Sequence, residues 1–224
     1  MPLNLEVTGI AAVTPSITQV ELTLAGGGTL PPFTAGAHID LALGNGVERS
    51  FSMLNDPAET HRYVIAVLRE TDSRGGSVWV HDHLRQGDRL TSSEPINNFP
   101  LNEAGETHTL IAGGIGITPL KAMAHRLVAR AASFALHYCA RDEGSAAYLQ
   151  DLRALLGDRL QLYLDGGDIA RGLDVGKLLA ARPSAAHVYV CGPAGLIRAV
   201  REATRDWPKG TVKSGSSGTS PFMP

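Results

Sequence analysis

The chain has 224 residues, of which 43% are hydrophobic and 19% are charged, the profile of a globular protein with one large or two small domains. Its formal net charge is −2 and only 5% of its residues are aromatic, which excludes a basic, base-stacking surface for nucleic acid. No apolar run approaches the roughly 20 residues of a membrane helix, and the N-terminal residues do not form a signal peptide. We therefore expect a cytoplasmic protein with neither a membrane nor a nucleic-acid partner.

The two cysteines, Cys139 and Cys191, stand far apart in the sequence. An iron–sulfur cluster normally takes about four cysteine ligands, so these two do not hold one. A disulfide between them stays open, and reduced thiols are the simpler interpretation for a cytoplasmic protein.

The first half, residues 1–102, is predicted to be rich in β-structure. Apolar and polar residues alternate in Val20–Leu24, His38–Leu43 and Tyr63–Val67. Glycine-rich turns at 25–28 and 43–46 separate them. Short strands divided by such turns favour an antiparallel sandwich or barrel.

One stretch of this half has the chemistry of a ligand site. In a strand, Arg49 and Phe51 share one face, and a guanidinium beside an aromatic ring suits a ligand with a phosphate and a flat ring system. The alternative is a surface arginine next to a core phenylalanine.

A second stretch precedes the helix predicted over 77–84. Gly75 and Gly76 come before Ser77, which we expect to cap this helix and to form an anion site at its start. The alternative is an ordinary capped helix. His81 and His83 lack a third ligand at a recognisable spacing, so we expect exposed helix histidines and no metal site.

The segment 110–120 reads as strand, glycine turn and helix. An apolar run at 109–112 predicts a buried strand, and the glycines after it allow a tight turn. Thr118 is expected to cap the next helix, with Pro119 at its first position. This arrangement presents N–H groups to a phosphate, although a packing turn explains the glycines equally well.

The rest of the chain, about 103–210, alternates between strands and helices. Strands are predicted at 134–139, 160–164 and 187–191, and helices at 145–156, 173–179 and 195–205. This rhythm predicts a doubly wound parallel sheet, which binds ligands beyond the carboxyl ends of its strands. Three candidate segments fall at those ends: Gly113–Thr118, Ala140–Asp142 and Cys191–Pro193. After Pro208, we expect residues 211–224 to form a flexible tail or the start of a linker.

Four motifs in this order resemble the ferredoxin–NADP reductase superfamily, and most of all its phthalate dioxygenase reductase type, which includes vanillate demethylase reductases. The motifs are the flavin motif 49–52, the flavin phosphate motif 75–77, the nicotinamide nucleotide motif 113–119 and the motif Cys191-Gly192-Pro193. The resemblance runs from near residue 4 to about residue 212. It implies two domains: an antiparallel β-barrel that binds flavin (1–102), followed by an α/β domain that binds the nucleotide (103–210).

The resemblance also implies roles for individual residues. Arg49 would meet the flavin phosphate or ribityl chain, Phe51 would pack on the isoalloxazine, and Ser52 would hydrogen-bond near flavin N5. Cys191 would lie against the reacting nicotinamide carbon, with its thiol in the cleft, so Ser52 and Cys191 are the expected catalytic residues. The other implied cofactor-binding residues are Ser50, Asn55, Ala66, Val67, Leu68, Gly75, Gly76, Ser77, Gly113, Gly114, Ile115, Thr118, Pro119, Arg141, Gly192 and Pro193.

The sequence departs from this family pattern in two ways. Many members have tyrosine where this chain has Phe51, so stacking is kept and one hydroxyl contact is lost. The type also continues into a ferredoxin domain with a [2Fe–2S] cluster, but residues 1–224 contain no Cys-x4-Cys-x2-Cys pattern. Whether that domain was removed or is supplied by a separate protein stays open.

The resulting hypothesis is a flavin-dependent NADH oxidoreductase, the reductase component of a Rieske-type oxygenase system. Electrons would pass from NADH through FMN to an iron–sulfur acceptor and then to a terminal oxygenase. NADH is expected over NADPH because Arg141 stands beside Asp142 and Glu143, a poor pocket for a 2′-phosphate. The alternatives are an FAD- and NADPH-dependent ferredoxin or flavin reductase, an electron-transfer subunit of a larger dehydrogenase, and a flavin-free regulatory module.

Overall fold

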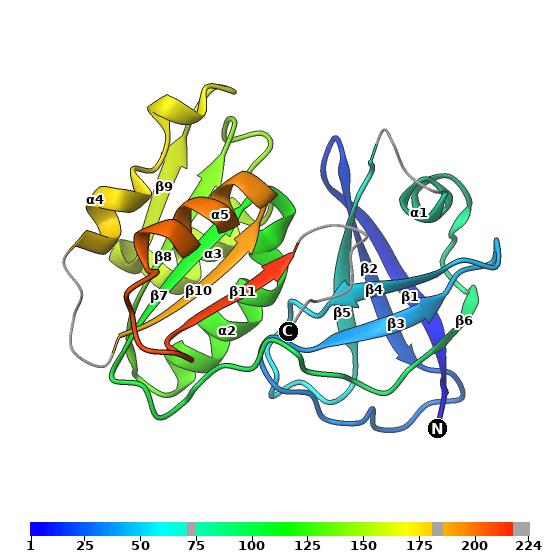
Figure 1. Cartoon of the computed structure of the whole chain (residues 1–224). Helices are drawn as coiled ribbons and strands as arrows, with labels where there is room; N and C mark the ends of the chain where they lie inside the picture. Colours follow the sequence, from blue (N-terminus) through cyan, green and yellow to red (C-terminus); the bar gives the residue numbers. More distant parts are fainter. Residues whose placement is uncertain (71–74, 181–185, 217–224) are drawn as a thin grey trace.

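The computed structural model describes residues 1–70, 75–180 and 186–216, and it has two halves, each built around one β-sheet (Figure 1). The first sheet has six strands in the order β4-β3-β6-β1-β2-β5, and every pair of neighbours is antiparallel. Its strands are β1 (Leu3–Thr14), β2 (Ile17–Leu24), β3 (His38–Ala42), β4 (Glu48–Ser52), β5 (Tyr63–Leu68) and β6 (Arg89–Ser92).

This first sheet curls into the expected barrel. A bridge between Met53 and Ile65 brings its two edge strands, β4 and β5, together. The inside is filled by fully buried apolar side chains from all around the sheet. Helix α1 (Gly76–His83) adds Val80 to this barrel core, and Leu84 follows it there.

The second sheet is parallel, in the order β11-β10-β7-β8-β9. Its strands are β7 (Thr107–Gly113), β8 (Ser133–Ala140), β9 (Leu160–Leu164), β10 (Ala186–Gly192) and β11 (Val212–Ser216). The helices α2 (Ile117–Ala129), α3 (Leu149–Leu156), α4 (Val175–Ala180) and α5 (Ala194–Ala203) lie between the strands in the sequence.

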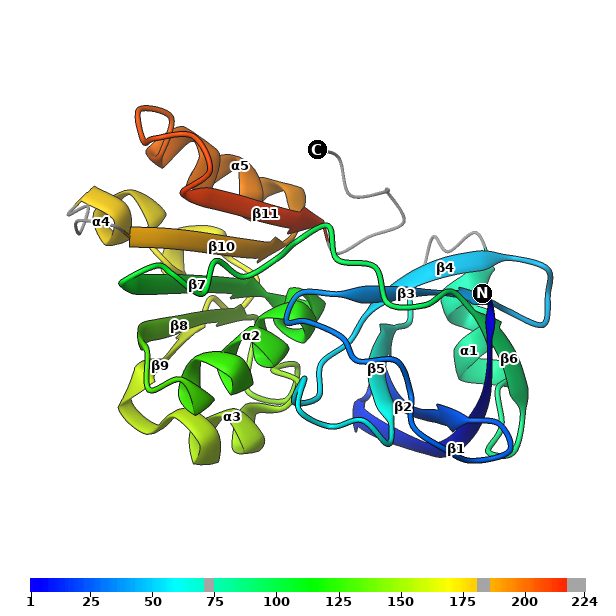
Figure 2. The ribbon, with the colours of Figure 1, turned by 90° about the horizontal axis from the view of Figure 1, so that it is seen from below.

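Helices cover both faces of the parallel sheet, as the sequence predicts for a doubly wound fold. Helices α2 and α3 lie on one side and α4 and α5 on the other (Figure 2). Successive residues of β7 follow this division, since Leu110 and Ala112 pack toward α2 while Ile111 packs toward α4 and α5. No helix of the described segments is both long and apolar enough to cross a lipid bilayer.

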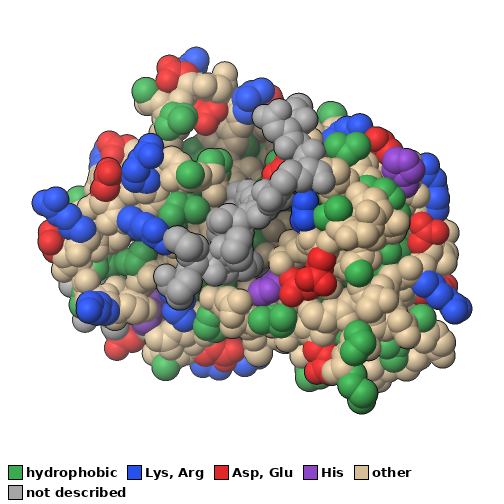
Figure 3. Space-filling model, turned by 45° about the vertical axis from the view of Figure 1, so that its right-hand side comes forward, with side chains coloured by type: hydrophobic (Ala, Val, Ile, Leu, Met, Phe, Trp, Pro, Cys, Tyr) green, Lys and Arg blue, Asp and Glu red, His purple; other side chains and the backbone are tan. Residues whose placement is uncertain are grey.

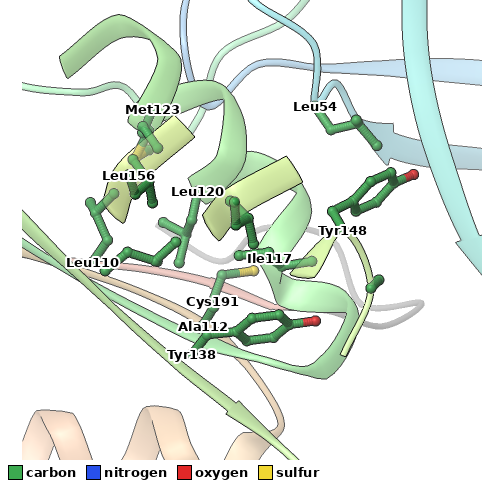
Figure 4. Close-up of a cluster of buried hydrophobic side chains, with 14 of the residues drawn as sticks. Leu54, Leu110, Ala112, Ile117, Leu120, Met123, Tyr138, Tyr148, Leu156 and Cys191 are labelled. Atoms are coloured by element: carbon green, nitrogen blue, oxygen red, sulfur yellow. The ribbon is translucent and has the colours of Figure 1, made fainter. Parts of the chain in front are cut away.

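One apolar cluster joins the two halves, and we call it the interface cluster. It contains Leu54 and Ala66 from the barrel half and Ile117 and Leu120 from α2. Figure 4 shows Leu54 facing the side chains of α2. Strand β5 serves both cores, because Val64 and Ala66 face the interface cluster while Tyr63, Ile65 and Val67 face the barrel core. The two halves are therefore packed against each other through buried side chains.

The structure corrects the prediction of a flexible tail from residue 211. Residues 212–216 form β11, which pairs in parallel with β10 over five positions. Lys213 in this strand donates a hydrogen bond of 2.6 Å to the carbonyl of Pro100, so the strand is also tied to the segment between the halves. Residues 217–224 lie outside the described ranges.

Gly36 lies at the contact between the halves, and its geometry gives a stability prediction. It has a φ of +94°, and a Cβ built on it would lie 2.0 Å from the carbonyl oxygen of Phe99 and 2.9 Å from Cε of Met123. We expect Gly36→Ala to lower the free energy of unfolding by more than about 2 kcal/mol, because it adds a clash to the cost of the left-handed conformation. Urea denaturation measures this change.

Gly87 is the matched control, since its φ is +92° but a Cβ there would meet nothing within 4 Å. Gly87→Ala should lower the free energy of unfolding by only about 1–2 kcal/mol. Equal losses in the two variants would contradict the clash.

Candidate functional site

Arg49 lies directly over Gly76, the first residue of α1. A Cβ on Gly76 would lie 2.9 Å from Nε and 3.0 Å from Cγ of Arg49, so the arginine side chain would have to shift if this residue were not glycine. Arg49 also donates a hydrogen bond of 2.8 Å to the carbonyl of Glu48. The structure thus brings together a guanidinium and a helix N-terminus, two groups that both attract a phosphate.

The start of α1 differs in detail from the prediction. Its N-cap is Gly75, which has a φ of +92° and no side chain of its own to cap the helix. The expectation that Ser77 is the cap is wrong: Ser77 lies inside the helix, and its buried hydroxyl accepts a hydrogen bond of 3.2 Å from the N–H of Glu70. Ser77 therefore ties the helix to the end of β5.

Within β4, the motif residues point in different directions. Arg49 and Phe51 are half-buried, and Phe51 packs against the barrel core. Ser50 is exposed, and its hydroxyl donates a 2.5 Å hydrogen bond to Asp40 on β3. Since alternate residues of a strand face opposite ways, the Ser50 side chain lies on the opposite face of the strand from Arg49 and Phe51. Ser52 is half-buried at the end of the strand.

Asn55 and β5 define the side of the barrel that faces the other half. Both ends of the buried Asn55 amide are engaged with backbone, since Nδ2 donates to the carbonyl of Arg62 and Oδ1 accepts from the N–H of Val64. Asn55 therefore braces a turn. Ala66 and Leu68 face the interface cluster, whereas Val67 faces the barrel core.

The glycines of the segment 113–116 are packed against the end of β10. A Cβ on Gly116 would lie 2.2 Å from the carbonyl oxygen of Cys191, and one on Gly113 would lie 2.7 Å from Cδ of Pro193. A Cβ on Gly192 would lie 3.0 Å from Cα of Gly113. The structure thus brings the two nucleotide motifs into direct contact at the carboxyl ends of β7 and β10.

The start of α2 is also not as predicted. A 3₁₀ turn, Gly114–Gly116, precedes the helix, which begins at Ile117 with Gly116 as its N-cap. The prediction that Thr118 caps the helix is wrong, because its hydroxyl donates a 3.1 Å hydrogen bond back to the carbonyl of Ile115. Pro119 still lies in the first turn, where its missing N–H costs nothing.

Cys191 ends β10 as predicted, but its thiol does not project into an open cleft. The residue is only 3% exposed, and its side chain lies among Ile117, Ala112 and Tyr138 (Figure 4). Burial raises the pKa of the Cys191 thiol to about 12. Cys191 is therefore a neutral thiol at neutral pH, and it packs in the same cluster as Ile117, the first residue of α2.

Arg141 lies at the carboxyl end of β8, beside the turn that follows β9. Its side chain is exposed, and a Cβ on Gly167 would lie 3.8 Å from its Nε. The two acids after it have other partners: Asp142 accepts from the N–H of Ser145 at 2.8 Å, and Glu143 pairs with Arg153 at 2.6 Å. The predicted crowding of Arg141 by these two carboxylates is thus weaker than the sequence suggests.

Sequence reasoning missed Lys121 and Tyr148, which lie in the interface between the halves. Lys121 is 7% exposed, and its ammonium lies 5.4 Å from the ring centroid of Tyr148 and 3.3 Å from Nε2 of His125. Burial lowers the pKa of Lys121, and the carboxylates of Asp151 and Glu59 oppose this shift. A lysine is normally exposed, so only the packed structure shows that Lys121 is buried.

The histidines of α1 also depart from expectation in one respect. His83 is exposed, but His81 is half-buried. Its Nδ1 lies 3.2 Å from Oγ1 of Thr18 and its Nε2 lies 2.9 Å from the carbonyl of Val67.

The described residues contain no group of three or more His, Cys, Asp or Glu side chains placed to hold a metal ion. Both cysteines are free thiols.

Known proteins share this arrangement. The chain is 39% identical over 220 residues to phthalate dioxygenase reductase of Burkholderia cepacia, covering 97% of this chain and 68% of that protein. The chain belongs to the phthalate dioxygenase reductase family. A solved structure of a phthalate dioxygenase reductase, described as a modular structure for electron transfer from pyridine nucleotides to [2Fe–2S], superposes with a TM-score of 0.91 over 96% of this chain and 68% of that one.

Other reductases are equally similar. The reductase subunit of tert-butanol monooxygenase / tert-amyl alcohol desaturase from Aquincola tertiaricarbonis is 41% identical over 99% of this chain and 66% of its own length. A vanillate O-demethylase oxidoreductase from a Pseudomonas species is 42% identical over 89% of this chain and 63% of its own length. The chain thus spans about two thirds of the length of these relatives. No family model matches it.

The raised thiol pKa values of this family member predict a loss of stability at alkaline pH. Burial raises the pKa of Cys139 to about 11 and that of Cys191 to about 12. The folded chain therefore keeps these protons above pH 8.5, where unfolded thiols lose them, so the free energy of unfolding falls as the pH rises from about 8.5. Urea denaturation at pH 7.5 and 9.5 measures the fall.

A chain with both cysteines replaced by alanine is the control, and it should show a smaller fall over the same pH range. Iodoacetamide should label the folded wild type at pH 8 far more slowly than the urea-unfolded chain. Rapid labelling of Cys191 in the folded protein would contradict its burial.

Proposed function

We propose that this chain is the flavin- and nicotinamide-binding part of an oxygenase reductase, which takes electrons from NADH through FMN to an iron–sulfur acceptor. One observation carries the proposal: the interface cluster joins Leu54 and Ala66, beside the flavin motif, to Ile117 and Cys191 of the nucleotide motifs. This packing fixes the half that carries the flavin motif against the half that carries the nucleotide motifs. The names of the relatives support the same function.

The residues present fit a flavin phosphate. The Arg49 guanidinium lies over Gly76, where a Cβ would displace it, and the N-terminus of α1 adds its positive end. When bound, the flavin would supply the chemistry of accepting a hydride and releasing electrons one at a time. The chain's own task is to hold both cofactors in a fixed geometry, for which no general acid or base is required.

Individual residues would then have distinct tasks. Phe51 offers an aromatic face and Ser52 a hydroxyl at the end of β4. The turn 113–116 would receive the nucleotide at the start of α2, with Cys191 below it closing the site to water. Ser52 and Cys191 remain the proposed residues nearest the reacting atoms.

NADH is the proposed nucleotide. Arg141 lies at the edge where a 2′-phosphate would bind, but the turn beside it carries Asp165 and Asp168. The N–H of Gly166 in this turn donates to the Arg141 carbonyl at 2.9 Å, so the two acids lie on the segment next to Arg141 and would weaken the attraction of this edge for a 2′-phosphate.

The electron acceptor would be an iron–sulfur domain or protein that serves a terminal oxygenase. A partner of this kind matches the description of the similar phthalate dioxygenase reductase. Charges of both signs are interspersed over the visible face of the described residues (Figure 3), in keeping with a net charge of −2.

Purification of the chain tests the proposal. We expect a yellow protein whose released flavin comigrates with FMN on chromatography, and whose colour is bleached faster by NADH than by NADPH. A dominant FAD peak would replace FMN in the proposal, and comparable kcat/KM values for the two nucleotides would count against NADH. A colourless protein that binds neither flavin would overturn the function.

Replacing Arg49 tests the phosphate contact. We expect Arg49→Ala to weaken FMN binding about tenfold to a hundredfold, because a charge-assisted hydrogen bond contributes roughly 1.5–3 kcal/mol. Fluorescence titration of the flavin-free protein gives the Kd. Arg89→Ala, which removes an exposed arginine on β6, should leave the Kd unchanged. An unchanged Kd for Arg49→Ala would show that its proposed role is wrong.

Replacing Cys191 tests its placement beside the nicotinamide. We expect Cys191→Ala to keep the fold and the flavin but to slow flavin reduction by NADH roughly tenfold to a thousandfold, because small misplacements of reacting atoms are costly. Stopped-flow bleaching measures the rate, and a melting curve reports the fold. Cys139→Ala is the control and should keep the rate. A destabilised Cys191→Ala protein with the wild-type rate would make Cys191 a packing residue only.

A further inference from the structure

The turn between β3 and β4 is clamped onto the start of α1. Asn45, at the tip of this turn, donates a hydrogen bond of 3.2 Å from Nδ2 to the carbonyl of Gly75. Its Oδ1 accepts a hydrogen bond of 3.2 Å from the N–H of Val47, which orients the amide. Gly44 lies against the indole of Trp79 on α1, where a Cβ would lie 2.4 Å from Cζ2.

The carbonyl that Asn45 holds belongs to the peptide that opens the helix. The oxygen of Gly75 also accepts the backbone N–H of Trp79 at 3.0 Å, so two donors fix its direction. The described segments contain no cis peptide bond, and in a planar trans peptide the N–H points opposite to the C=O. Fixing the oxygen of Gly75 therefore aims the N–H of Gly76 out of the first turn of α1, and the Cα of this same glycine lies against the Arg49 side chain.

This N–H is one of those that a helix leaves without an intrahelical acceptor, and such groups bind anions. Gly75 has a φ of +92°, and glycine gives up much conformational freedom on being fixed there. The amide of Asn45 donates to a carbonyl, so it orients this peptide without occupying the N–H groups that an N-cap side chain would bind. On the other side, Ser77 ties the helix to Glu70.

We propose that Asn45 is a positioning residue for the flavin phosphate: it orients the Gly75–Gly76 peptide so that its N–H meets the phosphate beside Arg49. Asn45 itself makes no contact with the phosphate. This inference rests on the proposed function, since it requires that a flavin phosphate binds at α1.

Comparison of FMN with riboflavin isolates this effect, because riboflavin lacks the phosphate. The two flavins are titrated into flavin-free wild type and Asn45→Ala, and each Kd is measured by fluorescence. We expect Asn45→Ala to weaken FMN binding on the order of three- to tenfold and to leave riboflavin binding unchanged. Unchanged riboflavin binding also shows that the variant is folded.

Two further variants complete the test. Asn45→Asp keeps an acceptor for Val47 but loses the donor to Gly75, so it should also lose FMN affinity selectively, and at high salt as well as at low salt. Asp88→Ala removes a side-chain brace at the other end of α1, where Oδ2 accepts from the N–H of Arg85 at 2.8 Å, and should change neither Kd.

The outcomes distinguish a failure of the role of Asn45 from a failure of the proposed flavin phosphate site. If wild type prefers FMN to riboflavin and Asn45→Ala keeps that preference in full, the role of Asn45 is overturned. Equal losses for the two flavins overturn it too, because they show a general structural effect. If wild type shows no preference for FMN, the phosphate site itself is overturned, and the role of Asn45 with it.

Discussion

The arrangement of the nucleotide half depends on one backbone contact, that of Gly116 with the carbonyl of Cys191. A Cβ on Gly116 would lie 2.2 Å from that oxygen, so no other residue fits without moving a strand. β7 and β10 are neighbours in the sheet, and this contact brings the segments that follow them together. The start of α2 and the end of β10 are thus fixed relative to each other before any ligand is considered.

The same region supplies the contact between the halves. Ile117, one residue after Gly116, belongs to the interface cluster together with Leu54 and Ala66 of the barrel. Apolar packing dominates this contact, and the charge buried in it, Lys121, lies over the ring of Tyr148. Since close-packed interiors resist deformation, the spacing between the flavin motif and the nucleotide motifs follows from side-chain volumes.

The sequence was sufficient for the fold class and for most elements, because the relevant signals are local. Alternation predicts β2, β3 and β5, and the strand–helix rhythm predicts the parallel sheet. Strand β1 is not predicted from alternation because two register shifts, between Val7 and Gly9 and between Ala12 and Thr14, interrupt its pattern. Strand β11 is not predicted either, because its Ser- and Gly-containing sequence forms a strand only through pairing with β10.

The candidate site was predictable in its motifs but not in its side-chain directions. Ser77 and Thr118 are residue types that favour N-caps, yet glycines take that position in both helices. Asn55 is committed to backbone groups of Arg62 and Val64, which are brought near it by the turn into β5. Cys191 stands at the predicted strand end, but the packing of Ile117 and Tyr138 determines that its thiol is buried. The direction and burial of these side chains depend on residues that are distant in the sequence.

The two glycine motifs serve different physical ends. In the nucleotide motif, Gly113 and Gly116 are explained by packing against Pro193 and Cys191, which any close turn between strands would require. Only Gly114, with a φ of +53° and nothing within 4 Å of a Cβ, leaves its surface open to a ligand.

At α1 the situation is reversed, because the missing Cβ of Gly76 makes room for a cation and not for backbone. Arg49 gains a hydrogen bond to the carbonyl of Glu48, but its guanidinium also lies near a positive helix end, and the two repel each other. The phosphate of the proposed function would offset this repulsion by binding both. The flavin phosphate motif, Gly75-Gly76-Ser77, therefore gives a stronger physical argument for a ligand than the nucleotide motif does.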